Sequence, residues 1–474
     1  MEALHYNNGM RPTPIIYAVL SLGLAITLIS REPQTDPRLK KSSRTGERGG
    51  WVQVHLEGTP AEIGFQHGYL LASEIQDTFK AVGIEVVHEE KKDWAFFRKA
   101  AEEVFWPHVE QEYREELTGI VEGQKAHGGK LDLWDVVALN AWLELPYYDK
   151  WKDKGLPAPT GNGPGDHCSA FVATGSYTRD GRIVIGHNNW TSYSSGTRWN
   201  IMFDILPAKG NRILMDGMAG LIHSGDDFGV NGAGIVITET TISEFSGFDP
   251  NGVPEFVRAR KAMQYAASID DFAHIMKEGN NGGYANNWLV ADRKNNEIAS
   301  LELGLKNVTL QRTKDGFFVG SNFPADPKLI KEETDFDPKD RSRSENARHE
   351  RWLALMEQNR GKIDVAAGQR FLADHVDAYE GKPDWNERTL CGHIEQSPRG
   401  MGNWQPAYAP AGAVQNKVTD AAGAARMSLV AALGHACGRD FKATEHLAKH
   451  PEFVWQKDIL RDMNARPWTR FTAK

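Results

Sequence analysis

The stretch GDHCSAF, residues 165–171, places one of only three cysteines of the chain between a polar loop and an apolar run. The residues before it, PAPTGNGPG at 157–165, are rich in glycine and proline and predict an exposed loop. The residues after it predict two strands, 169–177 and 182–187, joined by the hairpin signal Arg-Asp-Gly. Cys168 is therefore expected at the start of a β-hairpin, immediately after a loop.

A thiol in this position can attack the carbonyl carbon of the preceding residue, His167. Hydrolysis of the resulting thioester would release a new chain that begins with Cys168. Its free α-amine would have a pKa of about 7.7–8.0, so it can act as general base for its own thiol near neutral pH. The bond between His167 and Cys168 is the predicted cleavage site, and Cys168 the predicted nucleophile. The alternative is that Cys168 is only a small buried hydrophobe.

Attack on an acyl carbonyl also requires hydrogen-bond donors for the oxyanion that forms. Asparagine supplies an uncharged donor, and two asparagine-rich segments qualify. GHNNW at 186–190 ends the second strand of the hairpin, so pairing can return its polar residues to Cys168. YANNWLVAD at 284–292 begins a later strand. Turn capping is the alternative role for these asparagines, and a place in the core is the alternative for His187.

The composition is that of an ordinary globular protein. The chain has 474 residues, 40% hydrophobic residues and a net charge of −8. This length fits two to three domains or one large unit of helices and sheets. The acidic balance argues against a nucleic acid partner. Three cysteines are too few for a disulfide scaffold, although Cys391 and Cys437 can pair in an exported protein and leave Cys168 reduced.

The N-terminal segment differs from the rest of the chain. PIIYAVLSLGLAITLIS at 14–30 is apolar, with basic residues on both sides. Its length lies between that of a signal-peptide core and that of a bilayer span. We expect export to a periplasmic, secreted or lysosome-like location. The leader is either cleaved or kept as an anchor that associates with the membrane, and a polar linker follows up to residue 49.

Beyond residue 50, helical blocks enclose a strand-rich middle. Thr59, Pro60 and Glu62 predict a helix start, and amphipathic helices are expected up to about Trp142. Further strands are predicted at 199–205, 212–215, 234–242, 287–291 and 297–303. Further helices are predicted at 254–267, 269–277, 342–358, 365–373 and 424–433. This order predicts sheets covered by helices on their outer faces.

Four of these segments together resemble a known family. They are GTPAEIGFQHGYLL at 58–71, CSAF followed by GHNNW, GGYANNWLVAD, and GAVQNKVTD at 412–420. The chain resembles the phospholipase B-like proteins, and more broadly the peptidase C45 or acyl-CoA:6-aminopenicillanate acyltransferase group of N-terminal nucleophile hydrolases. The acyltransferase branch has an aspartate after a Gly-Gln-Asn-Trp run, whereas this chain reads His-Asn-Asn-Trp at 187–190. That difference favours the phospholipase B-like branch.

The resemblance implies an α+β fold, a four-layer αββα sandwich of the N-terminal nucleophile hydrolase type. It also implies self-cleavage before Cys168. Residues 50–167 would form the smaller fragment and 168–474 the larger catalytic chain, and the two would stay associated as one globular unit. By the same resemblance, the catalytic residues are Cys168 as nucleophile, His187 and Asn188 on the adjacent strand, and Asn287 as oxyanion donor.

Four further residues are predicted to bind substrate. Asn189, Trp190 and Asn286 belong to the motifs above. Arg341 belongs to DRSRSENARHERW at 340–352, where it, Arg343 or Arg348 can hold a carboxylate or phosphate by a bidentate contact. The alternative is that these arginines form a solvated helix face.

No cofactor and no metal site is predicted. His435 and Cys437 lie two positions apart, but no second cluster with ligand spacing accompanies them. A phosphate-binding loop and a GxGxxG motif that opens a helix are both absent from the sequence.

The function predicted from the sequence is hydrolysis of an acylated amide, or of a lipid ester, through a thioester. One alternative is an acyltransferase that passes the acyl group to an amine, and another is an uncleaved, noncatalytic ligand-binding ectodomain. Two bands rather than one on denaturing electrophoresis would separate the processed enzyme from the ectodomain.

Overall fold

The computed structural model describes residues 36–154, 168–226, 228–402 and 404–474. Residues from Arg38 to Lys474 form one compact unit. The apolar segment 14–30, the loop 157–165 and His167 lie outside the described residues. Within the described ranges, no helix combines the length and the apolar character needed to cross a bilayer.

Two large sheets form the centre of the compact unit. The first has nine strands in the order β1-β2-β5-β6-β7-β8-β9-β10-β11, of which β2 and β5 are parallel and all other neighbours antiparallel. Its strands are β1 (Ser43–Arg44), β2 (Val52–Gly58), β5 (Ile201–Pro207), β6 (Ile213–Gly217), β7 (Gly229–Asn231), β8 (Ile235–Thr241), β9 (Asn286–Asp292), β10 (Glu297–Leu303) and β11 (Val308–Thr313).

The second sheet has six antiparallel strands in the order β12-β3-β4-β15-β16-β17. They are β3 (Ser169–Thr174), β4 (Val184–Ser192), β12 (Gly316–Gly320), β15 (Ala411–Asp420), β16 (Ser428–Leu433) and β17 (Thr469–Thr472). A separate two-stranded ribbon pairs β13 (Val376–Asp377) with β14 (Lys382–Pro383).

Helices cover both outer faces. Those before β3 are α1 (Pro60–Leu70), α2 (Ala72–Glu90), α3 (Trp94–Ala100), α4 (Gln111–Ala126), α5 (Leu133–Asn140) and α6 (Leu145–Lys154). Those after β3 are α7 (Tyr193–Gly196), α8 (Glu255–Tyr265), α9 (Ile269–Lys277), α10 (Pro327–Glu333), α11 (Ser344–Gln358), α12 (Val365–Leu372), α13 (Ala421–Ala425) and α14 (Ala443–Lys449).

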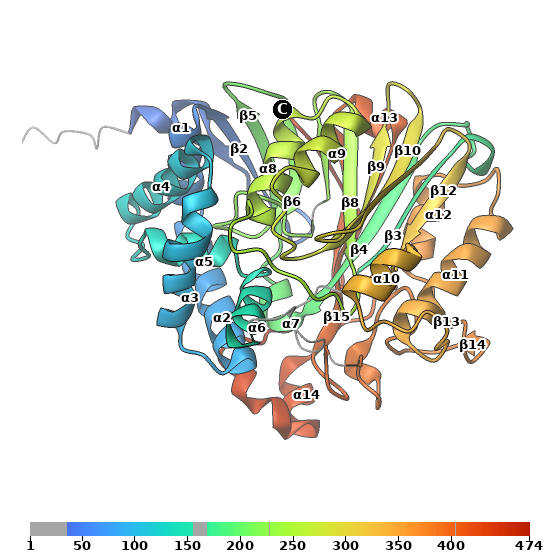
Figure 1. Ribbon diagram of the computed structural model, residues 1–474. Coiled ribbons are helices and arrows are strands. Elements are labelled where there is room, and N and C mark those ends of the chain that lie inside the picture. Colours follow the sequence, from blue (N-terminus) through green and yellow to red (C-terminus); the bar gives the residue numbers. More distant parts are fainter. Residues whose placement is uncertain (1–35, 155–167, 227, 403) are drawn as a thin grey trace, which may run out of the picture. The chain divides into compact units, whose positions relative to one another are not determined.

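The apolar cores define four layers, visible from left to right in Figure 1. The largest core joins α1–α6, α8 and α9 to the outer face of the nine-stranded sheet, through residues such as Ile63, Leu117 and Val290. Another joins the facing sides of the two sheets, through Ala170, Val236 and others. A third joins the six-stranded sheet to α11 and α12. The fold is therefore an α+β four-layer αββα sandwich, as the resemblance implied.

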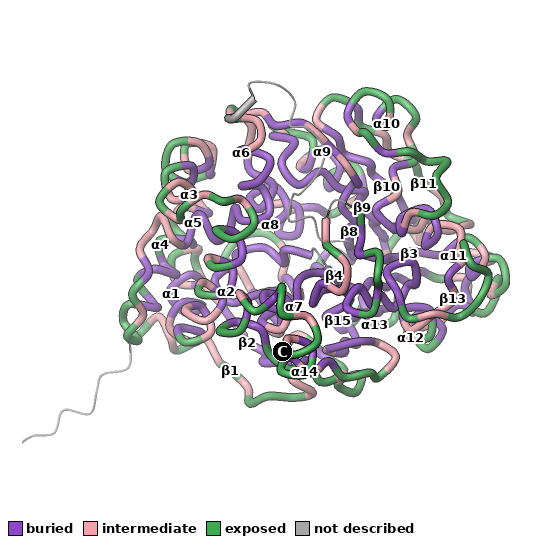
Figure 2. The backbone as a smooth tube through the Cα atoms, turned by 90° about the horizontal axis from the view of Figure 1, so that it is seen from below, coloured by how far each residue is buried: buried purple, intermediate pink, exposed green. Residues whose placement is uncertain are grey.

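Local signals explain where the first of these elements begins. The Thr59 side chain accepts a hydrogen bond from the backbone of Glu62, and the Glu62 carboxylate accepts one from the backbone N–H of Thr59. This capping box, followed by Pro60, fixes the start of α1 as predicted. The predicted hairpin also forms, since β3 and β4 are antiparallel neighbours. The residues of both strands are buried, and the backbone tube is coloured purple along most of them in Figure 2.

The end of the chain contradicts two predictions. The segment 424–433, predicted as a helix, contains the end of α13 and strand β16, and GAVQNKVTD, interpreted as a turn before a helix, belongs to the ten-residue strand β15. Both strands lie in the interior of the second sheet, and β15 is buried on both faces. A strand buried on both faces has no polar–apolar alternation. β16 is also buried along most of its length, and the alanine-rich segment 424–433 that contains it was therefore mistaken for a helix.

Candidate active site

Cys168 stands one residue before β3, at the edge of the layer between the two sheets. The register pairs Ser169 with Asn188 and Ala170 with His187, so its continuation places Cys168 opposite Asn189. Side chains opposite one another share a face, and faces alternate along a strand. Ala170 packs between the sheets, so Cys168, His187 and Asn189 face that inner layer. The Cys168 side chain is completely buried.

Asn189 is the asparagine that reaches the sulfur. The Cys168 thiol donates to Asn189 Oδ1, at 3.8 Å between sulfur and oxygen. The amide nitrogen Nδ2 of the same side chain is buried and has no hydrogen-bond partner among the described residues. Buried polar groups in native proteins are nearly always paired. An unpaired donor beside a thiol is therefore available to a group that is brought to that thiol.

Asn188 points to the opposite face and is already fully engaged. Its Oδ1 accepts from the backbone N–H of Ser169 at 3.2 Å and from the Trp190 indole N–H at 3.1 Å. Its Nδ2 donates to the carbonyl oxygen of Leu390 at 2.7 Å. Asn188 therefore holds the start of β3, the Trp190 ring and the loop at Leu390 together. Trp190 is buried and takes part in this packing.

Arg348 of α11 binds the backbone of the cysteine itself. Its guanidinium donates to the carbonyl oxygen of Cys168 at 2.6 Å and to Ser169 Oγ at 3.1 Å. It also donates to Asn322 Oδ1 and Ser344 Oγ, each at 2.9 Å. It lies 4.4 Å from the centre of the Trp190 ring. Burial lowers the pKa of Arg348 to about 10, so it remains charged at neutral pH.

The predicted Arg341 lies elsewhere. It forms a bidentate pair with Glu350, at 2.6 and 2.8 Å, and 59% of its side chain is exposed. Of the three arginines considered in the sequence, Arg348 is the one that contacts Cys168. A signal for this was present, because Arg348 precedes the buried Trp352 by four positions and so shares its face of α11.

A buried charge cluster lies beside His187. Lys417 of β15 is opposite His187, and its ammonium group bonds Asp216 at 3.0 Å and also Asp226. Burial opposes the charge of Lys417, but the two carboxylates outweigh it and raise its pKa. Burial and the neighbouring Asp226 raise the pKa of Asp216 to about 8. Burial and the charge of Lys417 together lower the pKa of His187 far below its usual value, which keeps the ring neutral.

Glu239 of β8 completes the cluster, and it was missed in the sequence. A carboxylate oxygen of Glu239, a ring nitrogen of His187 and the Cys168 sulfur all lie within 4.8 Å of one another. Glu239 also accepts a hydrogen bond from the Tyr284 hydroxyl at 3.0 Å. Its signal was a single acid inside the apolar strand GIVITETT, since buried acids are rare unless they are paired or functional.

The second pair of asparagines lies on β9 of the facing sheet. Asn287 Oδ1 accepts from Ser300 Oγ at 2.7 Å, and the side chain lines a cavity of about 150 Å³ together with Phe318 and His349. Asn286 is fully buried, and neither polar atom of its side chain has a hydrogen-bond partner among the described residues.

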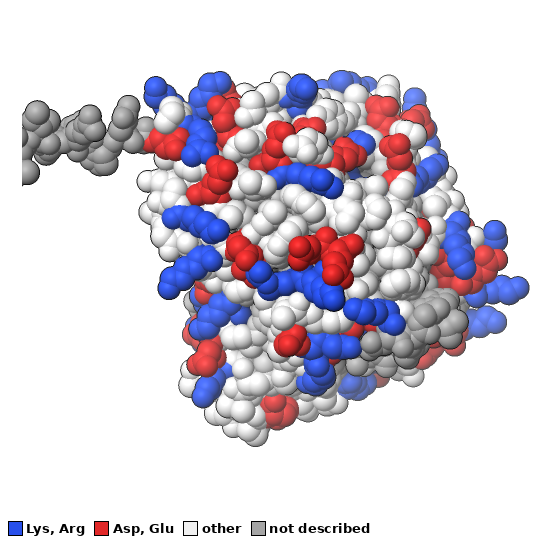
Figure 3. All heavy atoms as spheres, turned by 60° about the vertical axis from the view of Figure 1, so that its left-hand side comes forward, with Lys and Arg blue, Asp and Glu red and all other residues white. Residues whose placement is uncertain are grey.

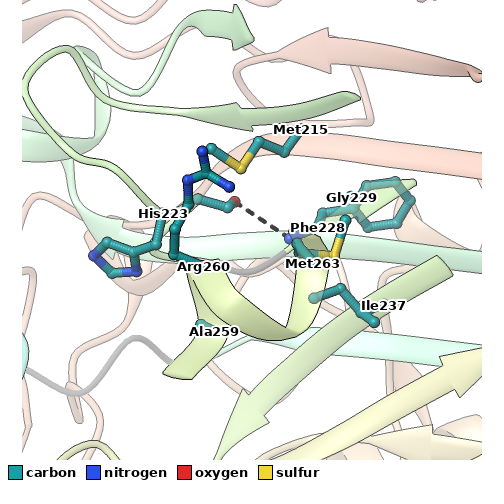
Figure 4. Close-up of a pocket in the computed structure, with 9 residues that line it drawn as sticks. Met215, His223, Phe228, Gly229, Ile237, Ala259, Arg260 and Met263 are labelled. Atoms are coloured by element: carbon teal, nitrogen blue, oxygen red, sulfur yellow. Dashed lines mark hydrogen bonds between the residues drawn. The ribbon is translucent and has the colours of Figure 1, made fainter. Parts of the chain in front are cut away.

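Two further cavities differ greatly in size. The cavity of Figure 4 lies between β6, β8 and α8 and measures about 10 Å³, room for one water molecule at most. It is too small for a substrate. A cavity of about 490 Å³ is lined by Ser192 at the end of β4, by aromatic residues such as Trp404 and Trp455, and by charged residues including Glu89. This volume is in the range of small-molecule sites.

The surface charges agree with the composition. On the face shown in Figure 3, Lys and Arg side chains are interspersed with Asp and Glu.

The structure is thus a four-layer αββα sandwich with a buried cysteine directly before an inner strand. The family model for phospholipase B matches residues 64–373, and the chain belongs to this family.

Individual proteins match over shorter stretches. An uncharacterized protein of Archaeoglobus fulgidus is 26% identical over 264 residues, which cover 52% of this chain and 42% of that protein. Phospholipase B-like protein C of Dictyostelium discoideum is 28% identical over 184 residues, which cover 34% of this chain and 32% of that protein. The chain thus spans less than half the length of these relatives. Among solved structures, a variant of conjugated bile acid hydrolase from Clostridium perfringens aligns with 58% of this chain and with 83% of the hydrolase chain. The sequence identity is 9% and the TM-score is 0.27.

Proposed function

We propose that this protein is a self-processing hydrolase in which Cys168 first releases itself as a new N-terminus and then cleaves acyl bonds, amides in preference to esters. The observation that carries the proposal is the setting of Cys168. Its sulfur lies beside the unpaired amide donor of Asn189, and its own carbonyl group is held by the buried guanidinium of Arg348.

In the first step, the Cys168 sulfur attacks the carbonyl carbon of His167. The C–N bond breaks, the nitrogen of Cys168 takes up a proton, and the acyl group passes to sulfur. Water then hydrolyses the thioester and leaves a carboxylate on His167. The complete burial of Cys168 supports this order, because a substrate can reach the sulfur only after the chain around it rearranges.

In the second step, the liberated α-amine takes the proton of the thiol, and the sulfur attacks the acyl carbon of the substrate. The leaving amine or alcohol takes up a proton, and water resolves the second thioester. Asn189 Nδ2 would donate to the oxyanion, together with Asn287, the oxyanion donor that the resemblance implies. Asn188 and Arg348 would act as positioning residues.

The test compares wild-type protein with Cys168→Ala and Cys168→Ser, using denaturing electrophoresis, intact mass and N-terminal sequencing. The 52.8 kDa chain would divide at residue 167 of 474 into fragments of about 19 and about 34 kDa. The larger fragment should begin with Cys168. The alanine variant should remain a single inactive chain, and the serine variant should be cleaved more slowly.

Activity is measured as release of product from a panel of acyl amides and phospholipids. Hydrolysis by wild-type protein whose bond before Cys168 is intact would refute the mechanism, as would activity retained in Cys168→Ala. Product that appears only when an amine acceptor is added would indicate the acyltransferase alternative. A single band without hydrolysis would indicate the noncatalytic ectodomain.

A further inference from the structure

Four ligand-type side chains converge outside the candidate active site. His375 follows α12, Cys391 and His393 lie in the loop before the 3₁₀ turn Ile394–Gln396, and Cys437 lies in the turn after β16. One ligand atom from each lies within 4.8 Å of every other. Cys391 and His393 are buried, and the other two are half-buried. The sequence predicted no metal site because these residues come from three separate segments without a regular spacing.

Two of the distances between these atoms are close to those of a tetrahedral metal site. His375 Nε2 lies 3.2 Å from His393 Nε2, and Cys437 Sγ lies 3.6 Å from the same nitrogen. Zn²⁺ binds nitrogen at about 2.0 Å and sulfur at about 2.3 Å, so in a tetrahedron two nitrogens lie about 3.3 Å apart, and a nitrogen and a sulfur about 3.5 Å apart.

The hydrogen bond on the far side of His393 fixes which nitrogen faces the cluster. His393 Nδ1 lies 3.0 Å from Glu395 Oε1, a carboxylate oxygen that can only accept, so Nδ1 carries the proton. In the neutral ring Nε2 then presents a lone pair, and both His375 and Cys437 are directed at it. One lone pair cannot satisfy both neighbours, whereas a cation placed between all four groups can.

Glu395 is itself held in place. Its other oxygen accepts from the Tyr193 hydroxyl at 2.7 Å, and Tyr193 also lies 3.0 Å from His435 Nε2. A carboxylate bonded to the far nitrogen of a ligating histidine is the usual support of a zinc site. His435, which the sequence singled out, therefore belongs to this supporting layer.

We propose that His375, Cys391, His393 and Cys437 form a structural Zn²⁺ site. Two thiolates and two imidazoles in a tetrahedron favour Zn²⁺ among the common metals, and four protein ligands leave no open position. The site would tie the segment between α12 and β15 to the turn after β16. It does not depend on the proposed hydrolase activity.

The site would also support the start of β3. Cys391 follows Leu390, whose carbonyl oxygen accepts the hydrogen bond of Asn188. Gly392, between the two buried ligands, has a φ of +64°, and a Cβ at that position would lie 2.3 Å from the Trp190 ring. The loop that carries two ligands therefore rests directly on the residues that hold Ser169 and Arg348.

The experiment measures the zinc content of the full chain after dialysis against Zn²⁺ and removal of the unbound metal. One Zn²⁺ per chain is expected for wild type, and loss of most of it for Cys391→Ser, Cys437→Ser and His393→Asn. His274→Asn, a change of an exposed histidine on α9, is the matched control and should keep the metal. Replacement by Co²⁺ should give the intense visible absorption of a tetrahedral thiolate complex.

A second measurement on wild-type protein does not depend on the folding of variants. Alkylation followed by peptide mass spectrometry should show that Zn²⁺ slows modification of Cys391 and Cys437, and that a chelator restores it. The proposal is overturned if wild type holds no more zinc than Cys391→Ser does. It is also overturned if protein isolated without reductant contains a disulfide between Cys391 and Cys437.

Discussion

Replacing Asn188 or Asn189 by leucine should affect the stability of the protein very differently. Asn189→Leu removes an amide nitrogen that has no partner among the described residues, and an oxygen that accepts the long, weak hydrogen bond of the Cys168 thiol, so the free energy of unfolding should change little. Asn188→Leu leaves the Ser169 N–H, the Trp190 N–H and the Leu390 carbonyl group without their partner. Each buried group left unpaired costs about 1–3 kcal/mol, so this variant should lose at least about 3 kcal/mol.

For catalysis we expect the reverse: Asn189→Leu should lower kcat more than Asn188→Leu does. If Asn189 Nδ2 stabilises the oxyanion, its removal should lower kcat by a factor of about 10² to 10³. The assay follows hydrolysis of the best substrate from the panel, divided by the cleaved fraction on a gel, so that slower self-processing is not mistaken for slower turnover. Urea denaturation, followed by fluorescence, gives the stability of both variants.

The reasoning is refuted if Asn189→Leu keeps the wild-type kcat. It is refuted equally if Asn189→Leu is as unstable as Asn188→Leu, because the assignment of the two residues to opposite faces of β4 would then be wrong. Each variant serves as the control for the other, since both exchange the same residue type for leucine at neighbouring buried positions.

Three further predictions follow from the electrostatics. Arg348→Met should be destabilised by more than about 3 kcal/mol in urea denaturation and should slow self-cleavage, because it removes several charged hydrogen bonds, one of them to Cys168. Arg341→Ala should change stability by less than about 1 kcal/mol and leave KM unchanged, since its pair with Glu350 is exposed; a tenfold rise in KM would restore the substrate-binding role predicted from the sequence. Burial raises the pKa of Asp216 to about 8, so the folded protein holds a proton that the unfolded chain releases near pH 4, and stability should fall as pH rises from about 4 to about 8. Asp216→Asn should flatten this part of the pH profile of the urea midpoint, and an unchanged profile would contradict the assignment.

Local sequence signals correctly predicted the elements that carry Cys168 and that begin the first long helix. Cys168, its hairpin and the cap at Thr59 depend on residues that are close in sequence, and each was found where expected. The orientation of the two faces of β4 was harder to predict from the sequence. The sequence could place Asn188 and Asn189 on opposite sides, but it could not tell which side faced Cys168, because β4 is buried on both.

The residues that approach Cys168 and His187 from distant strands could not be predicted from the sequence. Lys417 lies in a segment interpreted as a turn, and only its pairing opposite His187 reveals that it belongs to an inner strand. Glu239 reaches Cys168 from the other sheet. Such contacts depend on how two sheets pack, which the spacing of residues along one chain does not determine.

The alternation of β4 also explains how one strand can serve both catalysis and support. Its inner face presents His187 and Asn189 to the sulfur. There the unpaired amide group of Asn189 could donate a hydrogen bond to the oxyanion of the proposed reaction. Its outer face presents Asn188 and Trp190 to Arg348 and to the loop of the proposed zinc ligands, where every donor and acceptor of Asn188 is engaged. In the proposed mechanism the thiol attacks the bond directly before it, which requires its backbone to be held still. The outer face would hold that backbone without entering the space proposed for a substrate. We therefore expect loss of Zn²⁺ to slow self-cleavage while leaving the Cys168–Asn189 contact chemically intact.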